Sequence, residues 1–213
     1  AEKQVEAWQT ARYRVYAQDV YADPHLALAM MLHRALEFAF CGGELPPAFW
    51  RMTDAEAVRH LKTCNLGTRV LIGEVERLRP YRLVAERGYT GQDEWSGGAP
   101  LDFNWRDWRL RRAVADEVAE MAGMEPWETA AYLGVGKDTK AITLPLRGTD
   151  GELRPVRARV LPVYRIRIYA RRPLPSAAKL MLNDVGGFCR SVVLGRIPQP
   201  IGAHVADVPT SDF

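Results

Sequence analysis

Hydrophobic periodicity changes once along this chain, and the change sets the fold class. Up to about residue 122, apolar residues mostly recur at the three- and four-residue spacing of amphipathic helices. From Ile142 onward they alternate with other residues around Asp150-Gly151, as in antiparallel strands joined by a turn. A last helix is expected over 176–194. The pattern predicts an α+β fold, predominantly helical over its first two-thirds, followed by a small antiparallel sheet and a C-terminal helix.

Composition shifts divide the chain into four stretches. Residues 1–87 are expected to be helical, with the helical pattern continuing briefly over Tyr81–Arg87. Residues 88–104 contain four glycines and are expected to form a long loop. Residues 105–195 form an α+β lobe in this interpretation, and the proline-containing residues 196–213 form an extended tail.

The segment 23–41 is the most apolar helix candidate. Asp23-Pro24 is expected to supply an N-cap and a first-turn proline, and Gly42-Gly43 to end the helix. Apolar residues cover almost its whole circumference, so this helix should be central and buried. We also expect an exposed apolar patch, or a partner chain, over part of it.

Other helix boundaries follow from capping residues. Thr53 and Glu56 form a capping box that starts a helix running to about Lys62. A further helix is expected from about Gly67 to Leu78, with Leu78 facing inward. Asn104 is expected to cap a helix that Gly123 ends.

Composition excludes several classes of protein. The chain has 213 residues, and its 29 basic and 26 acidic residues leave a formal charge of +3. That charge is too small for a protein held to a polyanion by bulk electrostatics, so nucleic acid is not the expected partner. Three widely spaced cysteines fit a reducing cytoplasm. No apolar run approaches the roughly 20 residues that span a bilayer, so a cytoplasmic protein without membrane contact is expected.

Motifs for metal or nucleophilic chemistry are absent from the sequence. It contains no Cys-x-x-Cys, His-Glu-x-x-His or Gly-x-Ser-x-Gly, which excludes the common zinc and serine-hydrolase signatures. The four histidines are scattered, and each is interpreted as a capping or polar-face residue. Asp19 and Asp23 could share a cation with a third ligand, but a solvated turn plus an N-cap is the favoured interpretation. No metal site and no cofactor are expected in this chain.

Two groups of side chains are candidates for nucleotide binding. In the first helix, cationic and aromatic side chains can contact phosphate and stack on a base; they are Lys3, Arg12, Tyr16 and Tyr21. In the strand region, guanidinium groups on one face can grip phosphate oxygens; they are Arg157, Arg159, Arg165 and Arg167. Each group has a structural alternative. The tyrosines can lie at the edge of the core, and the arginines can pair with nearby carboxylates.

The order of several motifs resembles the HD-domain phosphohydrolases of the deoxynucleoside triphosphate triphosphohydrolase type. The resembling segments are Glu2-Lys3, Ala11–Tyr16, Val20-Tyr21, Met52–Glu56, Arg77 with Tyr81-Arg82, and Tyr164–Tyr169. In that family a His, a His-Asp dipeptide and a later Asp bind a divalent metal. This chain has no His-Asp dipeptide, Ala55 replaces the second Asp of one motif, and Asp23 stands where a His would follow.

The resemblance implies that the chain is the C-terminal portion of an HD-type phosphohydrolase, beginning after the metal ligands. It implies a parent protein that uses Mg²⁺, Mn²⁺ or a similar ion to hydrolyse a nucleotide or deoxynucleotide. Lys3, Arg12, Tyr16 and Tyr21 would flank that nucleotide, residues 1–87 would be the C-terminal part of the HD domain, and a homo-oligomer is expected. This chain alone is expected to be catalytically inactive, because it lacks the ligands that activate water.

Two alternatives remain open at this point. One is a non-enzymatic nucleotide-sensing or oligomerisation module that never had a metal site. The other is a single-stranded nucleic-acid binder that uses the four strand-region arginines, which would bind oligonucleotides with a steep salt dependence.

Overall fold

The computed structural model describes residues 22–89, 107–135, 144–147, 151–156 and 164–196, together with residues 4, 7, 8 and 11. The fold is α+β, as predicted. The elements in chain order are α2 (Asp23–Cys41), η2 (Pro47–Arg51), α3 (Asp54–Leu61), α4 (Leu66–Glu76), β1 (Arg82–Tyr89), α5 (Trp108–Ala122), η3 (Pro126–Glu128), β2 (Thr129–Val135), β3 (Leu144–Arg147), β4 (Leu153–Val156), β5 (Tyr164–Ala170), α6 (Ser176–Met181), η4 (Leu182–Asp184) and α7 (Val185–Arg196).

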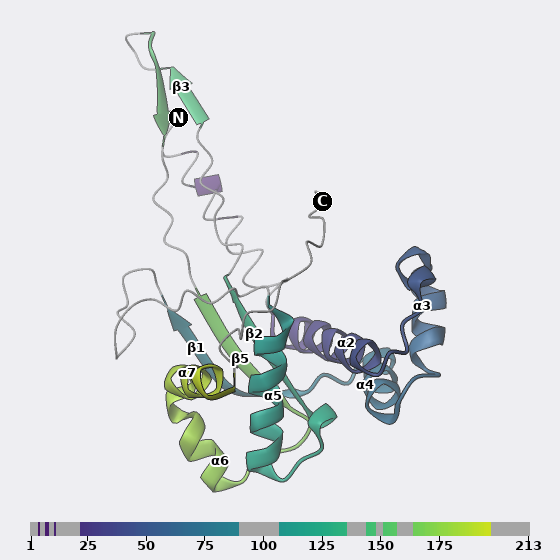
Figure 1. The fold of residues 1–213 in the computed structure, drawn as a ribbon. Helices are drawn as coiled ribbons and strands as arrows, with labels where there is room; N and C mark the ends of the chain where they lie inside the picture. The colour runs from purple at the N-terminus through teal and green to yellow at the C-terminus, as the bar shows by residue number, and fades with distance from the viewer. Residues whose placement is uncertain are drawn as a thin grey trace, which may run out of the picture.

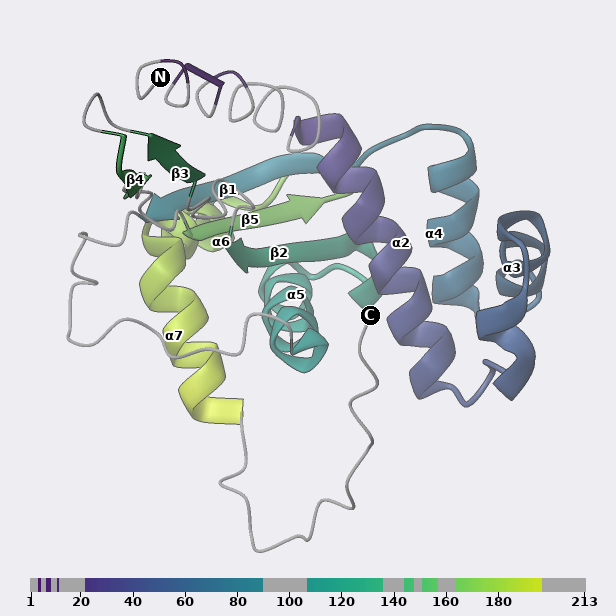
Figure 2. The ribbon, with the colours of Figure 1, turned by 90° about the horizontal axis from the view of Figure 1, so that it is seen from above.

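A three-stranded antiparallel sheet, in the order β1–β5–β2, lies at the centre of the fold. Helix α2 crosses one face of this sheet, while α5 and α7 cover the other (Figures 1 and 2). Helices α4 and α3 lie beyond α2, on the side away from the sheet (Figure 2). The sheet therefore separates two hydrophobic cores, one beneath α2 and one beneath α5 and α7.

Strand β5 confirms the predicted period-two pattern. Ile166 and Ile168 are fully buried in the core beneath α5 and α7. Tyr169 is buried in the core beneath α2, and Arg167 lies on the same face of the strand as Tyr169. A residue's position in this alternation therefore decides which of the two cores it joins.

Strand β1 corrects the expectation that the helical pattern continues over Tyr81–Arg87. Pro80 lacks the backbone donor that a helix interior needs and disfavours a helical residue before it. The following residues instead pair with β5, from Arg82 opposite Ala170 to Tyr89 opposite Tyr164. The stretch expected to be wholly helical thus contributes an edge strand to the sheet of the later lobe.

Leu78 is a second correction. It was expected to face inward, but it is 73% exposed and has a φ of 52°. Helix α4 ends at Glu76, and the left-handed conformation of Leu78 turns the chain toward β1. The residue therefore lies outside the helical register from which its burial was predicted.

The ends of α2 agree with the prediction in part. The helix begins at Asp23 and ends at Cys41, Gly42 is its C-cap, and Gly43 adopts a positive φ of 67°, as the glycine pair predicted. Asp23 is not the N-cap. Ala22 holds that position without a side-chain hydrogen bond, and Asp23 is the first helical residue, where its charge favours the helix dipole.

The remaining boundaries follow the capping chemistry closely. Thr53 and Glu56 form the predicted capping box at the start of α3. Gly123 ends α5 in the left-handed conformation, whereas Asp107 rather than Asn104 caps its start. Strand β2 was not predicted, because its short run with Gly134 carries little alternation; it pairs with β5 throughout.

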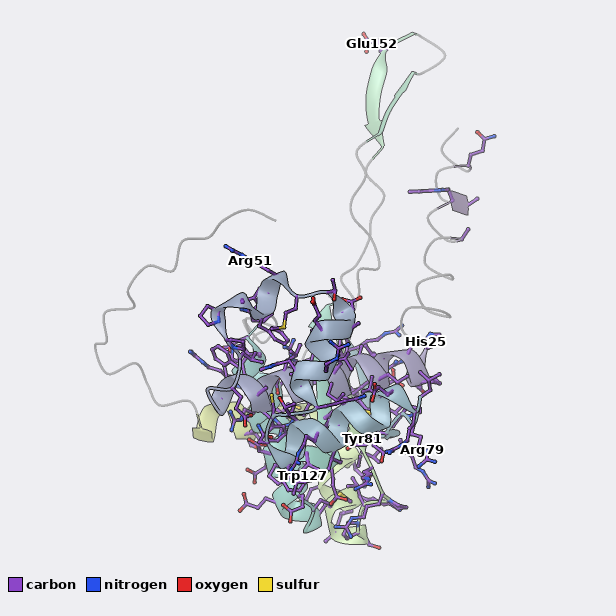
Figure 3. All side chains as sticks on the ribbon, turned by 90° about the vertical axis from the view of Figure 1, so that its right-hand side faces the viewer. His25, Arg51, Arg79, Tyr81, Trp127 and Glu152 are labelled. Carbon is purple, nitrogen blue, oxygen red and sulfur yellow. The ribbon has the colours of Figure 1, made fainter. Side chains whose placement is uncertain are left out.

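The predicted hairpin is present as the pair β3–β4, with Leu144 opposite Val156. Gly151 has a φ of 81° in the turn, and Glu152 lies beside it on the hairpin (Figure 3). Over the residues that the structure describes, no helix combines the length and the apolar character needed to cross a membrane.

Candidate functional site

A pocket of about 290 Å³ lies between the C-terminal half of α2, η2 and the start of α5. Its lining is mostly aromatic and aliphatic and includes three polar side chains, His33, Glu37 and Arg111. The lining residues are His33, Leu36, Glu37, Phe40, Leu45, Trp50, Trp108 and Arg111. We call it the Glu37 pocket, after the carboxylate at its base.

The Glu37 pocket exists because three chain segments bring aromatic rings together. Phe40 is near the end of α2, Trp50 is in η2, and Trp108 opens α5. Phe40 meets Trp108 edge to face at 5.9 Å between ring centroids, and Trp50 meets Phe49 in the same way at 5.3 Å. Phe40 is 59% exposed and Trp50 is 72% exposed, so the rings leave an open apolar surface.

A buried ion-pair network supports the base of the pocket. Arg34 is only 2% exposed, and its Nη1 donates to Oε2 of Glu37 at 3.3 Å. Its Nη2 donates to Asp116 of α5 and to the carbonyl oxygen of Pro126. Arg112 adds a contact to Asp116. The network ties α2 to α5, and breaking one buried partner of such a pair is costly.

Glu37 is itself only 9% exposed, and its second oxygen is less well paired than its first. Oε1 lies 3.9 Å from Nη2 of Arg111, beyond hydrogen-bond range. Nε of Arg111 is buried and has no hydrogen-bond partner among the described residues. Glu37 and Arg111 thus present an acceptor and a donor group side by side in a mostly apolar hollow.

Burial dominates the titration of the polar groups here. Desolvation raises the pKa of Glu37, and the charges of Arg34 and Arg111 oppose that shift. Partial desolvation of the His33 imidazole, with the nearby Arg111 charge, lowers its pKa from 6.5. His33 is therefore neutral at pH 7 and can donate or accept a hydrogen bond.

A second, more open hollow lies beside α3. Its lining includes Arg51, Arg59 and His60, together with Glu56. Arg51 projects from the molecule here (Figure 3). The His60 Nε2 is 2.7 Å from the carbonyl oxygen of Glu44, and Glu56 is engaged in the capping box. The cations are exposed, so this hollow is a shallow basic surface.

Most residues predicted for nucleotide binding lie outside the described residues. This holds for Lys3, Arg12, Tyr16, Tyr21, Arg157 and Arg159, and also for Asp19 and His204. Among the predicted residues, Arg165 and Arg167 are described, and both belong to β5.

Arg167 already has carboxylate partners. Its Nε donates to Oε1 of Glu86 on β1 at 2.8 Å, and its Nη1 lies 3.1 Å from Oδ1 of Asp23. The arginine is buried between the two. Pairing with carboxylates was the structural alternative to a phosphate-binding role, and it ties β5 to the start of α2.

The remaining titratable candidates have simple placements. Cys64 and Cys189 are buried and Cys41 is exposed. His25 lies in the first turn of α2. Within the ranges that the structure describes, no three His, Cys, Asp or Glu side chains gather closely enough to hold a metal ion.

The sequence did not predict the Glu37 pocket. One signal was present, since Arg34 and Glu37 lie three residues apart in an otherwise apolar helix, where charged residues need partners. Asp116 and Arg111 are about 80 residues away, so their part in the site depends on how α5 packs against α2. No family model, curated protein or solved structure was found to match the chain.

Proposed function

We propose that this chain is the C-terminal portion of a metal-dependent HD-type phosphohydrolase of nucleotides or deoxynucleotides, and that it contributes nucleotide-flanking and assembly surfaces. The observation that carries the proposal is how the family-like segments pack. Arg82 of the Tyr81-Arg82 segment begins β1 and pairs with Ala170, the residue that follows the Tyr164–Tyr169 segment in β5. Segments that resemble one family at distant points of the sequence are thus neighbours in space.

Tyr81 anchors the first of these segments. It is buried, its hydroxyl donates to the carbonyl oxygen of Trp127 at 2.8 Å, and its backbone N–H contacts Sδ of Met31. Tyr81 and Trp127 lie in the body of the molecule, whereas Arg79 points away from it (Figure 3). The tyrosine of the Arg77 and Tyr81-Arg82 motif therefore fixes the path of β1 against α2.

The proposed chemistry divides between the parent and this chain. A divalent metal bound in the parent, Mg²⁺ or Mn²⁺, would activate water for attack on phosphorus. Lys3, Arg12, Tyr16 and Tyr21 of this chain would hold the nucleotide in position through phosphate contacts and stacking. The sequence contains no His-Asp dipeptide, so we expect no hydrolysis by this chain alone.

The test is a titration of the chain with the four deoxynucleoside triphosphates in the presence of Mn²⁺ or Mg²⁺. We expect binding without release of triphosphate or deoxynucleoside. Replacing Arg12→Met should weaken binding about tenfold, because a charge-assisted hydrogen bond is lost. Arg69→Met, a substitution at an exposed position of α4, is the matched control. Absence of binding would refute the nucleotide-flanking role. Metal-dependent hydrolysis would refute the prediction that this chain lacks the metal site needed for catalysis.

A second candidate is a non-enzymatic nucleotide-sensing or oligomerisation module. The exposed rings of Phe40 and Trp50, which line one mostly apolar pocket, favour it, because contiguous exposed apolar surface commonly marks an interface. Light scattering of the chain and of a Trp50→Ser variant tests the assembly role. The coding sequence immediately upstream separates the candidates. A His, a His-Asp pair and a later Asp there would support the phosphohydrolase, whereas an immediate start codon would support the module.

A further inference from the structure

The Glu37 pocket has the dimensions and walls of a site for one planar ring system. Its volume of about 290 Å³ is at the small end of ligand pockets. Phe40, Trp50 and Trp108 line it from three different elements, and Leu36 and Leu45 add aliphatic surface. Aromatic side chains stack on flat heteroaromatic rings in a way that tolerates different ring identities.

The polar side of the pocket supplies a matched pair of hydrogen-bonding groups. Oε2 of Glu37 is occupied by Arg34, which holds the carboxylate in one orientation. Oε1 lies beyond hydrogen-bond distance of Arg111, and both groups line the pocket. A ligand that offers a donor beside an acceptor on one edge can therefore bond to Glu37 and Arg111 together. Both bonds would be charge-assisted.

We propose that the Glu37 pocket binds a nucleobase, with the ring against Trp50 and Trp108 and the base edge against Glu37 and Arg111. Every common base carries an N–H donor next to an acceptor on its pairing edge. Carboxylates accept from such donors and arginines donate to such acceptors in base recognition. The inference rests on the proposed function and goes beyond it, because it adds a separate pocket for the base to the first-helix residues proposed to hold the nucleotide.

The base is that of a free nucleotide and not part of a strand. Around the pocket, three arginines (Arg34, Arg111 and Arg112) face two carboxylates (Glu37 and Asp116), which leaves one excess positive charge. A groove that follows a nucleic-acid backbone needs several unpaired cations along its length. One excess charge suits a single nucleotide.

The experiment uses nucleosides, which have a base but no phosphate. Each of the four deoxynucleosides is titrated beside its counterpart in which methyl groups replace the edge N–H donors, with binding followed by calorimetry and ligand-detected NMR. At least one nucleoside should bind, and its methylated counterpart should bind at least about tenfold more weakly, because Glu37 loses its donor. If no nucleoside binds, or if methylation has no effect, the proposal is wrong.

Variants locate the binding. Trp50→Ala changes an exposed side chain and should keep the fold, yet weaken nucleoside binding about tenfold through lost stacking. Arg111→Met should do the same by removing the donor. Leu78→Ala and Arg69→Met change exposed residues outside the pocket lining, and they should bind nucleosides like the unmutated chain. Equal binding by the Trp50→Ala variant and the parent chain would overturn the assignment to this pocket.

Two further comparisons separate this inference from the function on which it rests. Triphosphates that bind while nucleosides do not would leave the nucleotide-flanking role standing and remove the base pocket. A short single-stranded oligonucleotide should compete with the nucleoside no better than its individual bases do. If the oligonucleotide binds markedly more tightly than its bases, and this binding is lost in Trp50→Ala, the pocket binds single-stranded nucleic acid and not a free nucleotide.

Discussion

The two faces of the central sheet pack against different kinds of side chain. Beneath α5 and α7 the core is almost entirely aliphatic, with Ile166, Ile168, Val114 and Val118 fully buried. The face toward α2 also has an apolar core, but the buried charged side chains of the described residues lie on this side: Arg34, Glu37 and Arg167. A hydrophobic core needs only volume and shape, whereas buried charges need exact partners. We therefore predict that the core beneath α5 and α7 serves stability alone, and that the proposed binding chemistry lies on the α2 face, where the start of α5 also contributes Trp108 and Arg111.

The largest expected effect tests the charged face. Arg34→Met should lower the free energy of unfolding by about 3–5 kcal/mol, because Glu37 and Asp116 then lose a buried cationic partner. Urea denaturation measures the change. Adding Glu37→Met to that variant should recover part of the lost free energy of unfolding, because it removes the buried carboxylate that has lost its Arg34 partner. A loss below about 1 kcal/mol, or no recovery, would mean that the network is not coupled as described.

The aliphatic face should respond differently. Ile168→Ala should cost about 3 kcal/mol, because a fully buried side chain leaves a cavity that its neighbours fill only in part. Thermal or urea unfolding gives the value, with the exposed Leu78→Ala as a control that should change stability by less than about 0.5 kcal/mol. Nucleotide binding should be unchanged. Loss of binding with retained fold would contradict the separation of the two faces.

Arg167 should have a smaller effect than Arg34. Its partners Glu86 and Asp23 are 39% and 52% exposed at their side chains, so water compensates them when the arginine is removed. Arg167→Met should cost about 1–2 kcal/mol. Arg171→Met should cost about 0.5 kcal/mol or less, because Arg171 is 44% exposed, its contacts to Glu74 and Glu128 are 3.4 and 3.7 Å long, and Glu128 keeps Arg172 as a partner. Equal effects at the two positions would show that burial of Arg167 adds nothing.

The smallest effect concerns pH. The folded state raises the pKa of Glu37 above its ordinary 4.5, so folding favours the protonated form. The contribution of Glu37 to the free energy of unfolding is then largest at low pH and declines as pH rises above 4.5 toward the folded-state pKa. The free energy of unfolding is measured for the unmutated chain and for Glu37→Gln from acid to neutral pH. The variant should become the more stable of the two as pH rises. The opposite slope would mean that attraction to Arg34 and Arg111 outweighs desolvation.

The features that could be predicted from the sequence are those that depend only on residues close together in the chain. The glycines after α2, the Thr53–Glu56 capping box and the alternation in β5 were predicted because each depends on residues within one turn or one strand. Strand β1 was mistaken for helix, because its pairing partner β5 lies some 80 residues later. Backbone pairing with a distant strand overrides weak local preference.

The candidate site was harder to predict for the same reason. Arg34 and Glu37 lie three residues apart on α2, but the position of Trp50 depends on the turn at Gly42-Gly43, and that of Arg111 on the packing of α5. A pocket formed by three segments has no signature within any one of them. The predicted residues of the first helix (Lys3, Arg12, Tyr16 and Tyr21) and of the strand region (Arg157 and Arg159) stay predictions, because they lie outside the described residues.

Amide hydrogen exchange with and without a deoxynucleotide tests most directly whether the α2 face is the nucleotide-binding face. We expect slower exchange in peptides from the second half of α2, from η2 and from the first turn of α5, where the Glu37 pocket is lined. Peptides from α6 and α7 should exchange as in the free chain. Slowing confined to α6 and α7, or no slowing anywhere at a saturating nucleotide concentration, would contradict the assignment.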